Sequence, residues 1–497
     1  MAGGLVSWAD YQGLANLGGL SMDTSDLDTG IAAGSDVDAL NKALSAGSDI
    51  NNPGSSQGEG FPLRVESLDQ TLFNVTYSAD DIKFWKRLYK DSAFNTVEEF
   101  NRLEEYGSGD SIYIAEGELP VEDDSTYSRQ YTKIKFMGTT RRVTHVMSVI
   151  KAAHGDAVAR EVVNGTLFLL RQLERALFTG DENLIPIQFD GIETLLMKAF
   201  NSNLSEDGQY LGYEDTNVID LRGAPPTEDV INDLAERLVA EPNYGRPTDL
   251  WLPTGPTKDL SKIMFPKERA NLPYNNGTAG LAIERIVTPF GTINLNPDIF
   301  IPDSVTAKAT GIGKAALRPQ APTLGTLTSP AYAGSNQTFF GSTDAGAYWY
   351  KVIAGSRYGR SAPTTSLAAV TVSSGDQVNI PVTDAGPDTS YYEVYRSDKD
   401  GTAATCRTIM RVARTGPTQT IVDLNRFLPN TSKGYMLSQE QDVLKWKQLA
   451  PFTKINLATI DTSIRWMQIM YGALQLMKPR YNGMLINVGK LPTGAYA

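Results

Sequence analysis

The sequence predicts a mixed α+β fold that is interrupted by an all-β segment. Three patterns support this prediction: a long helical pattern at residues 156–178, strand-like and helical segments that alternate irregularly at 248–302, and short strand-like runs without helices at 336–424. After residue 431 the mixed pattern returns. The all-β segment is therefore predicted to be an insertion into another domain.

Composition restricts the classes of function. The 497 residues are 41% hydrophobic and 21% charged, which is ordinary for a soluble globular protein of about three domains. The net charge of −12 disfavours tight, salt-driven binding to DNA or to an anionic membrane. One cysteine, Cys406, and two histidines, His145 and His154, exclude disulfides within the chain and disfavour Cys- or His-built metal sites. We expect neither a signal peptide nor a membrane span.

The N-terminal part is predicted to be an arm followed by a helix. Residues 1–60 are rich in Gly, Ser, Asp and Asn and offer little to bury, which is typical of an extended arm. Ser78 and Asp81 form a capping-box pattern in front of an amphipathic stretch at 82–90. Its lysines and arginine could touch nucleic acid, but a helix packed on one face explains the same residues and is preferred.

Residues 110–149 are predicted to form a long hairpin. Two alternating runs, Ser111–Ala115 and Tyr131–Met137, flank an acidic loop that contains a proline. The acids of this loop could hold a cation, but a solvated tip is the preferred interpretation. These residues are Glu116, Glu118, Glu122, Asp123 and Asp124.

The helix over 156–178 has recognisable ends. Asp156 can cap its start and Gly180 can end it. Gly165 in its middle costs about 1 kcal/mol relative to alanine, so a close neighbour is expected there. A second helix is predicted after Gly191 and a third over 227–241.

Asp181, Glu182 and Asp190, which follow the long helix, could be active-site carboxylates. They could equally be turn residues between two packed elements. No partner that would shift their pKa values is visible in the sequence, so we interpret them as turn residues.

The all-β segment has the number of strands expected for one β-sandwich. The seven expected strands lie around 337–340, 348–354, 366–372, 377–382, 391–396, 406–413 and 418–423. A Pro/Gly/Ser-rich stretch from about 318 to 335 reads as a linker. The aromatic residues Tyr348, Trp349, Tyr391 and Tyr395 are expected to pack in the sheets rather than to bind a ligand.

No catalytic, cofactor-binding or metal-binding motif is convincing. "TGIGKA" at 310–315 lacks the first glycine and the final Ser or Thr of a phosphate loop, and "SDKDG" at 397–401 lacks the later ligands of a calcium loop. No Ser or Cys motif accompanies the two histidines. We therefore predict that the protein is not an enzyme and needs no cofactor.

The order of elements resembles a known family. An arm and an acidic-tipped hairpin lead into a helix that ends "ALFTGD"; "FDGI" and "GTINLNPDIFIP" follow, and "MYGALQLMKPRYNGMLINV" comes near the C-terminus. This order is similar to that of the major capsid proteins of tailed double-stranded-DNA bacteriophages, which have the Hong Kong 97-like fold. The resemblance covers about 61–316 and 432–497.

The resemblance implies a domain plan. It comprises an N-terminal arm (1–60), the start of the peripheral domain with the E-loop hairpin (61–149), the spine helix with peripheral and axial domains (150–319), the insertion (320–430), and a return to the axial and peripheral domains (431–497). In this family the E-loop lies across a neighbouring subunit. Contacts with the neighbour are accordingly expected at the five loop acids and at Lys133 and Lys135.

The same resemblance implies partners and location. The chain would assemble with itself into the pentamers and hexamers of an icosahedral shell in the virion, built in the host cytoplasm. Portal, scaffold and cement or decoration proteins would be further partners, and packaged DNA would be touched weakly and without sequence preference. No membrane partner is expected.

The insertion resembles immunoglobulin-like or fibronectin type III modules. "YKVIAGSRYGRSAPTTS" (350–366) and "YEVYRSDKDG" (392–401) match strand pairs of that family. The alternative function is therefore a phage tail-associated or secreted protein that binds or degrades glycans and carries such a module, which predicts paired carboxylates in a concave domain.

Some relatives join subunits through a Lys–Asn isopeptide bond. Lys133 and Lys135 lie in the hairpin, and Asn482 and Asn487 lie near the C-terminus. The alternation of "TKIKF" is enough to explain both lysines as the solvent face of a strand, so no cross-link is expected.

Overall fold

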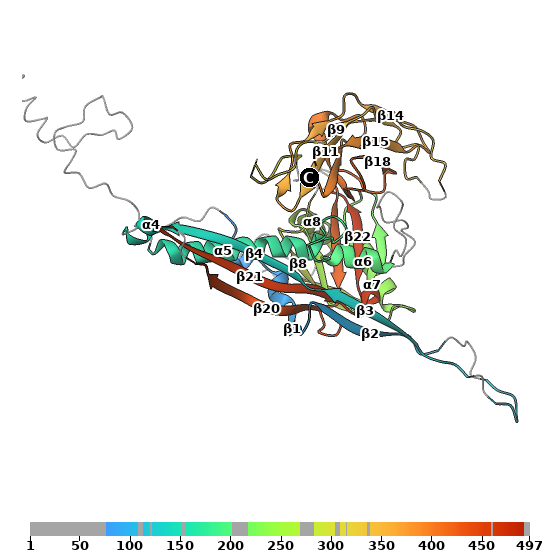
Figure 1. Ribbon diagram of the computed structural model, residues 1–497. Coiled ribbons are helices and arrows are strands. Elements are labelled where there is room, and N and C mark those ends of the chain that lie inside the picture. Colours follow the sequence, from blue (N-terminus) through green and yellow to red (C-terminus); the bar gives the residue numbers. More distant parts are fainter. Residues whose placement is uncertain are drawn as a thin grey trace, which may run out of the picture. The chain divides into compact units, whose positions relative to one another are not determined.

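A computed structural model describes most of the chain from residue 76 onward (Figure 1). The described residues are 76–107, 113–119, 122–150, 155–200, 217–268, 283–303, 309–314, 316–334, 338–384, 386, 388–458 and 461–491. The predicted N-terminal arm and His154 lie outside them. Among the described helices, none combines the length and apolar character needed to cross a bilayer.

A six-stranded mixed sheet is buried on both faces. Its order is β5-β22-β19-β6-β8-β7, with β5 (Val218–Asp220), β22 (Gly483–Val488), β19 (Ser432–Leu437), β6 (Asp249–Leu252), β8 (Gly291–Pro297) and β7 (Arg285–Thr288). The inner strands β6 and β22 are buried at every residue, as expected of strands covered from both sides. One face packs on α7 (Glu228–Val239) and α8 (Thr254–Glu268), through residues such as Leu234 and Leu260.

The second large sheet has the order β1-β20-β21-β4. It contains β1 (Tyr89–Ser92), β20 (Leu444–Asn456), β21 (Ser463–Leu476) and β4 (Lys135–Thr144). α5 (Ala157–Thr179) runs along its long strands (Figure 1). The short helix α4 (His145–Val149) follows β4 directly, and His145 is its first residue.

α5 has the ends and the crowded glycine that the sequence predicts. The Asp156 side chain accepts a hydrogen bond from Val158 N–H, and Gly180 is the C-cap. A Cβ atom on Gly165 would lie 2.2 Å from Oε1 of Gln468 in β21. The next helix, α6 (Ile192–Phe200), begins directly after Gly191.

One apolar core joins α5 to both large sheets. Leu173, Leu177 and Phe178 of α5 belong to the same buried cluster as Trp446 of the long sheet and Trp251 of the six-stranded sheet. The rings of Phe178 and Trp251 have centroids 6.3 Å apart. This packing fixes α5 between the two sheets.

The predicted hairpin exists, but its first strand lies elsewhere. β2 (Val97–Glu105) pairs antiparallel with β3 (Thr126–Lys133) in a two-stranded sheet, hereafter the ribbon. The expected strand at Ser111–Ala115 is wrong, because its described residues Tyr113–Ala115 are not in a strand. The run Tyr131–Met137 belongs to two strands, which buried Ile134 separates. β2 was missed because its alternation uses acids and Asn beside few apolar residues.

The predicted helix over 82–90 is largely wrong. The Ser78–Asp81 capping box is present, but it starts only the 3-10 turn η3 (Ala79–Asp81). The helix α3 covers only Phe84–Arg87, and the chain then enters β1, which pairs in parallel with β20. The tertiary strand partner overrides the local helical pattern.

The all-β segment forms two packed sheets and a small third pair. One sheet has the order β12-β11-β16-β17 with β13 on β11, the second is β18-β15-β9, and β10 pairs with β14. The strands are β9 (Thr323–Leu324), β10 (Gly346–Tyr348), β11 (Tyr350–Ser356), β12 (Gly359–Arg360), β13 (Thr364–Thr365), β14 (Val370–Val372), β15 (Val378–Thr383), β16 (Tyr391–Arg396), β17 (Arg407–Ala413) and β18 (Thr418–Asp423). Their shared core includes Val352, Val394 and Ile380, so we call this segment the sandwich.

Six of the seven expected strand positions contain strands. The exception is 337–340, whose described residues 338–340 are not in a strand. β9, within the expected linker, pairs with β15 instead. The four singled-out aromatic side chains are buried or partly buried, consistent with packing.

The central strands of the sandwich are buried on both faces. β16 is buried at every residue, although alternation would require only one covered face. On the second face Ile353, Tyr395 and Cys406 form a small cluster, against which Ala309 packs. Burial raises the pKa of the Cys406 thiol to about 11, so it stays protonated.

The Gly165 contact yields a stability prediction. Gly165→Ala should destabilise the protein by about 1 kcal/mol, although helix propensity alone favours alanine by a similar amount. The reason is that a new Cβ displaces Gln468, whose Nε2 donates to Val162 O at 2.8 Å and to Thr166 Oγ1 at 3.4 Å. In a Gln468→Ala background the same change should stabilise. Urea unfolding of the wild type, both single variants and the double variant measures the sign of the stability change in each background. Destabilisation by Gly165→Ala in both backgrounds would contradict the steric explanation.

Candidate assembly surface

The ribbon exposes apolar side chains that a single subunit does not cover. Tyr127 is 71% exposed and Tyr131 is 63% exposed on β3, while Leu119 near the tip is 92% exposed. An isolated two-stranded hairpin is at best marginally stable in water. In the single chain these apolar side chains of the ribbon are therefore left exposed to solvent.

The five acids predicted at the tip are exposed. Glu116 and Glu118 lie at or beside a turn, and Glu122, Asp123 and Asp124 precede β3. From Leu103 to Ser128 the sequence has eight acids and no lysine or arginine. In the part of the chain that the structure describes, no group of three or more acids, His or Cys is arranged to hold a metal ion. The tip is thus a strongly anionic surface.

The base of the ribbon is tied to the rest of the subunit by three cations. Arg102 Nε donates to Met477 O at 2.8 Å. The Nζ atoms of Lys133 and Lys135 lie 3.1 and 3.0 Å from Oε1 of Glu182. Lys135 also donates to Pro186 O at 2.7 Å. The expectation that both lysines simply line a solvent face is wrong, since Lys135 is only 14% exposed at its side chain.

The carboxylates after α5 have partners that the sequence did not show. Burial opposes ionisation of Glu182, but Lys135 and Lys133 outweigh it, so its pKa lies below the ordinary value. Hydrogen bonding to Glu182 raises the pKa of Lys133. Burial raises the pKa of Asp181. The interpretation as turn residues holds for the backbone, where Asp190 Oδ1 accepts from Glu182 N–H at 2.8 Å. The pKa values of Asp181 and Glu182 are nevertheless shifted by burial and by partners that the sequence did not show.

The two candidate cross-linking asparagines are buried and hydrogen-bonded. Asn482 Oδ1 accepts from Ser438 N–H at 2.9 Å, and its Nδ2 donates to Lys478 O at 3.0 Å. Asn487 Nδ2 donates to Asp220 and to Arg426 O. Both side chains are at most 2% exposed. Neither amide is exposed on the surface of this chain.

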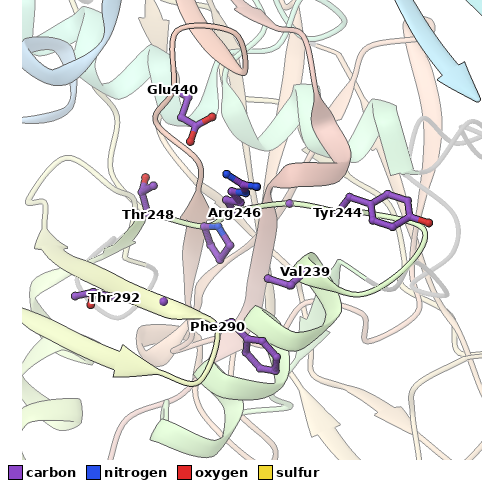
Figure 2. A pocket seen from close by; sticks show the side chains of 10 residues that line it. Val239, Tyr244, Arg246, Thr248, Phe290, Thr292 and Glu440 are labelled. Carbon is purple, nitrogen blue, oxygen red and sulfur yellow. The ribbon is translucent and has the colours of Figure 1, made fainter.

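A shallow hollow among the described residues lacks a carboxylate pair. It measures about 540 Å³ and is lined by the end of α7, the segment before β6, the β7–β8 turn and Glu440. In Figure 2 the side chains of Tyr244, Phe290 and Glu440 lie on different sides of Arg246. Glu440 is the only carboxylate in this lining. A two-carboxylate glycosidase site is therefore not built there.

A buried carboxyl pair lies elsewhere, at the start of α3. Glu174 Oε1 accepts from the N–H groups of Lys83 and Phe84 at 3.0 and 2.7 Å, and Oε2 accepts from Trp85 N–H at 2.9 Å. Asp298 Oδ1 accepts from Phe300 N–H, while its Oδ2 has no donor partner among the described residues. Burial, with the neighbouring Asp298, raises the pKa of Glu174 to about 8. The three N–H groups that donate to Glu174 hold α5 against the start of α3.

Relatives identify this architecture. Residues 51–320, just over half of the chain, match the family model described as SU10 major capsid protein. The chain belongs to the SU10 major capsid protein family. The predicted resemblance to phage major capsid proteins is thereby confirmed, and the alternative of a glycan-binding or glycan-degrading protein is not supported.

Curated relatives agree with the SU10 family assignment. The chain is 23% identical over 450 residues to the major capsid proteins of Staphylococcus phage S25-3 and Staphylococcus phage K, covering 87% of this chain and 91% of theirs. Among solved structures, the capsid of a native GTA particle overlaps 88% of this chain and 99% of its own, with 8% identity and a TM-score of 0.45. The capsid of Myoviridae phage XM1 overlaps similarly, with a TM-score of 0.41.

The buried carboxyl pair of this SU10 family member predicts a pH-dependent stability. Because the pKa of Glu174 is raised, the folded chain binds its proton more tightly than the unfolded chain does. This stabilisation is complete below an unfolded pKa of about 4.3 and is lost as pH rises towards 8. The slope is at most about 1.4 kcal/mol per pH unit for one proton. Asp298→Asn supplies a permanent donor to Glu174 and should flatten this slope and stabilise the protein at pH 8. Chemical unfolding at pH 5 to 8 measures it.

The matched control for this prediction is Asp80→Asn, since the Asp80 side chain is 98% exposed. This variant should keep the wild-type slope. A slope that survives Asp298→Asn would assign the pH dependence to other groups.

Proposed function

We propose that the chain self-assembles into the icosahedral shell of a phage head that encloses double-stranded DNA, and that the ribbon is the E-loop that makes the contact between neighbouring subunits. One observation carries this proposal: a ribbon with exposed aromatic residues and an acidic tip extends from a base that three cations fix. Burial of such residues against a second copy would supply the stabilisation that a lone hairpin lacks.

We assign the rest of the chain to a Hong Kong 97-like plan. α5 is the spine helix, α5 with the long sheet is the peripheral domain, and the six-stranded sheet with α7 and α8 is the axial domain. The order of elements along the chain supports this assignment, as does the return of residues 432–488 into both sheets. The contact residues of the E-loop are the five tip acids, with Lys133 and Lys135 at its base.

Pentamers and hexamers are the expected closed assemblies, with portal, scaffold or decoration proteins as further partners. The net charge of −12 favours weak, salt-sensitive contact with packaged DNA, which lets the DNA slide along the inner wall. Assembly in the host cytoplasm and residence in the virion follow from the same proposal.

The sandwich at 320–430 is proposed to be an immunoglobulin-like insertion exposed on the shell. Its two sheets share a core of aliphatic and tyrosine side chains, in which Tyr350 and Tyr392 come from paired strands. A module of this size does not fit within a shell one subunit thick without separating neighbours, so an external position is expected.

The ribbon assignment predicts an assembly defect without a folding defect. Deleting residues 117–126 should reduce shell formation, because it removes four of the five tip acids and the exposed Leu119. The subunit should still fold, since these residues lie outside its buried clusters. Electron microscopy with sedimentation measures assembly, and circular dichroism with thermal melting measures folding.

A Gly/Ser replacement of the same ten residues is the matched variant that keeps chain length. It should assemble as poorly as the deletion if the tip side chains make the contact. If both variants form normal shells, the ribbon is not the E-loop.

The buried asparagines predict shells without covalent links. Mature particles should run as single subunits on denaturing gels, because Asn482 and Asn487 are buried and their amides are already hydrogen-bonded. A ladder of covalent oligomers would contradict this. Its loss in Lys133→Arg or Lys135→Arg would then identify the reacting lysine.

A further inference from the structure

We infer that the connection between α5 and α6, residues 180–191, is a mechanical junction that couples the docking of the sandwich to the orientation of the ribbon. The ribbon base contacts this connection at Glu182, and the sandwich contacts Thr179, the residue directly before it. It is a property of the single chain and holds whether or not the proposed shell contacts are correct.

The two ends of the connection are pinned together. Gly191 N–H donates to Gly180 O at 2.9 Å, and Thr194 Oγ1 donates to the same oxygen at 2.6 Å. A Cβ on Gly180 would lie 2.4 Å from Phe189 O, and one on Gly191 would lie 2.6 Å from Ala176 O. Because the backbones touch, any larger residue at either position would force them apart. The connection therefore moves as one piece with the end of α5.

The ribbon is held on one side of this piece. Glu182 forms ion pairs with Lys133 at the end of β3 and with Lys135 at the start of β4. One carboxylate therefore binds both sides of the point where the ribbon leaves the long sheet. Asp190 fixes Glu182 in turn through its backbone N–H and is itself paired with Lys198 at 2.7 Å. A shift of Glu182 is thus a shift of the ribbon base.

The sandwich is held on the other side. Arg411 of β17 donates from Nη2 to Thr179 O, the last residue of α5, at 3.1 Å. Its charge also interacts with Asp181 and with Glu193 of α6. Glu193 accepts from Lys433 Nζ at 2.5 Å and from Tyr435 Oη at 3.3 Å, which ties this side to β19. The sandwich therefore contacts Thr179 and the ribbon base contacts Glu182, three positions further along the chain.

Coupling through a pinned connection is reciprocal in free energy. Loosening Arg411 should loosen the ribbon base, and loosening Glu182 should loosen β17. An event that shifts the sandwich, such as contact with another protein, would thereby reach the ribbon without touching it.

Hydrogen exchange of the full chain tests the junction in both directions. Arg411→Met should raise amide exchange at residues 126–135 by about fivefold or more, the lower end of typical couplings. Arg414→Met is the control, because Arg414 pairs at 2.8 Å with Asp384 inside the sandwich and does not contact the junction. It should leave exchange at 126–135 unchanged.

The reverse test uses Glu182→Gln, which alters a partly exposed ion pair and does not remove core packing. It should raise exchange in β17 by a similar factor, whereas Glu161→Gln, which weakens the Arg141 pair near the other end of α5, should not. The inference is wrong if Glu182→Gln loosens the ribbon and leaves β17 at its wild-type rate. It is equally wrong if the two controls act as strongly as the junction variants.

Discussion

The apolar face of α5 is the surface on which the rest of the structure depends. Leu173, Leu177 and Phe178 meet side chains from both large sheets, so one helix sets the position of each sheet relative to the other. Burying side chains of this size contributes about 1.5–3 kcal/mol each, more than an exposed ion pair does. Apolar packing sets the position of α5 between the sheets, and polar contacts at the two ends of this face add to its stability. At one end the buried Glu174 accepts a hydrogen bond from Phe84 N–H at the start of α3. At the other end Thr179 O accepts one from Arg411 of the sandwich.

Features that depend on residues close together in the sequence were predicted correctly. The Asp156 cap, the stop at Gly180 and the crowding at Gly165 follow from helix chemistry that a short window of sequence contains. Most strands of the sandwich were predicted for the same reason, because alternation and turn residues mark them. The family followed from the order of these elements, even though each motif is weak when taken alone.

Features that depend on distant partners could not be predicted. β1 has a helical sequence pattern and becomes a strand because β20 lies beside it. Glu182 looks like a turn residue until the fold brings Lys133 and Lys135, 49 and 47 positions away, to its carboxylate. The second face of β16 is likewise covered by a small cluster separate from the main sandwich core, against which Ala309 packs. In each case the deciding contact joins segments that are far apart in the sequence. The hydrophobic periodicity of either segment alone does not show that they will meet.

Strands β19 to β22, at residues 432–488, occupy interior positions of both large sheets, and this placement governs the timing of folding during synthesis. Neither sheet can close until these strands have left the ribosome, because their neighbours are made much earlier. Contacts between such distant segments form slowly, and unpaired strands exposed meanwhile are prone to aggregate. Met477, which anchors Arg102, is also made late, so the ribbon gains its fixed base only when translation is nearly over. A nascent chain on a polysome is thereby kept from offering a finished binding surface to its neighbours.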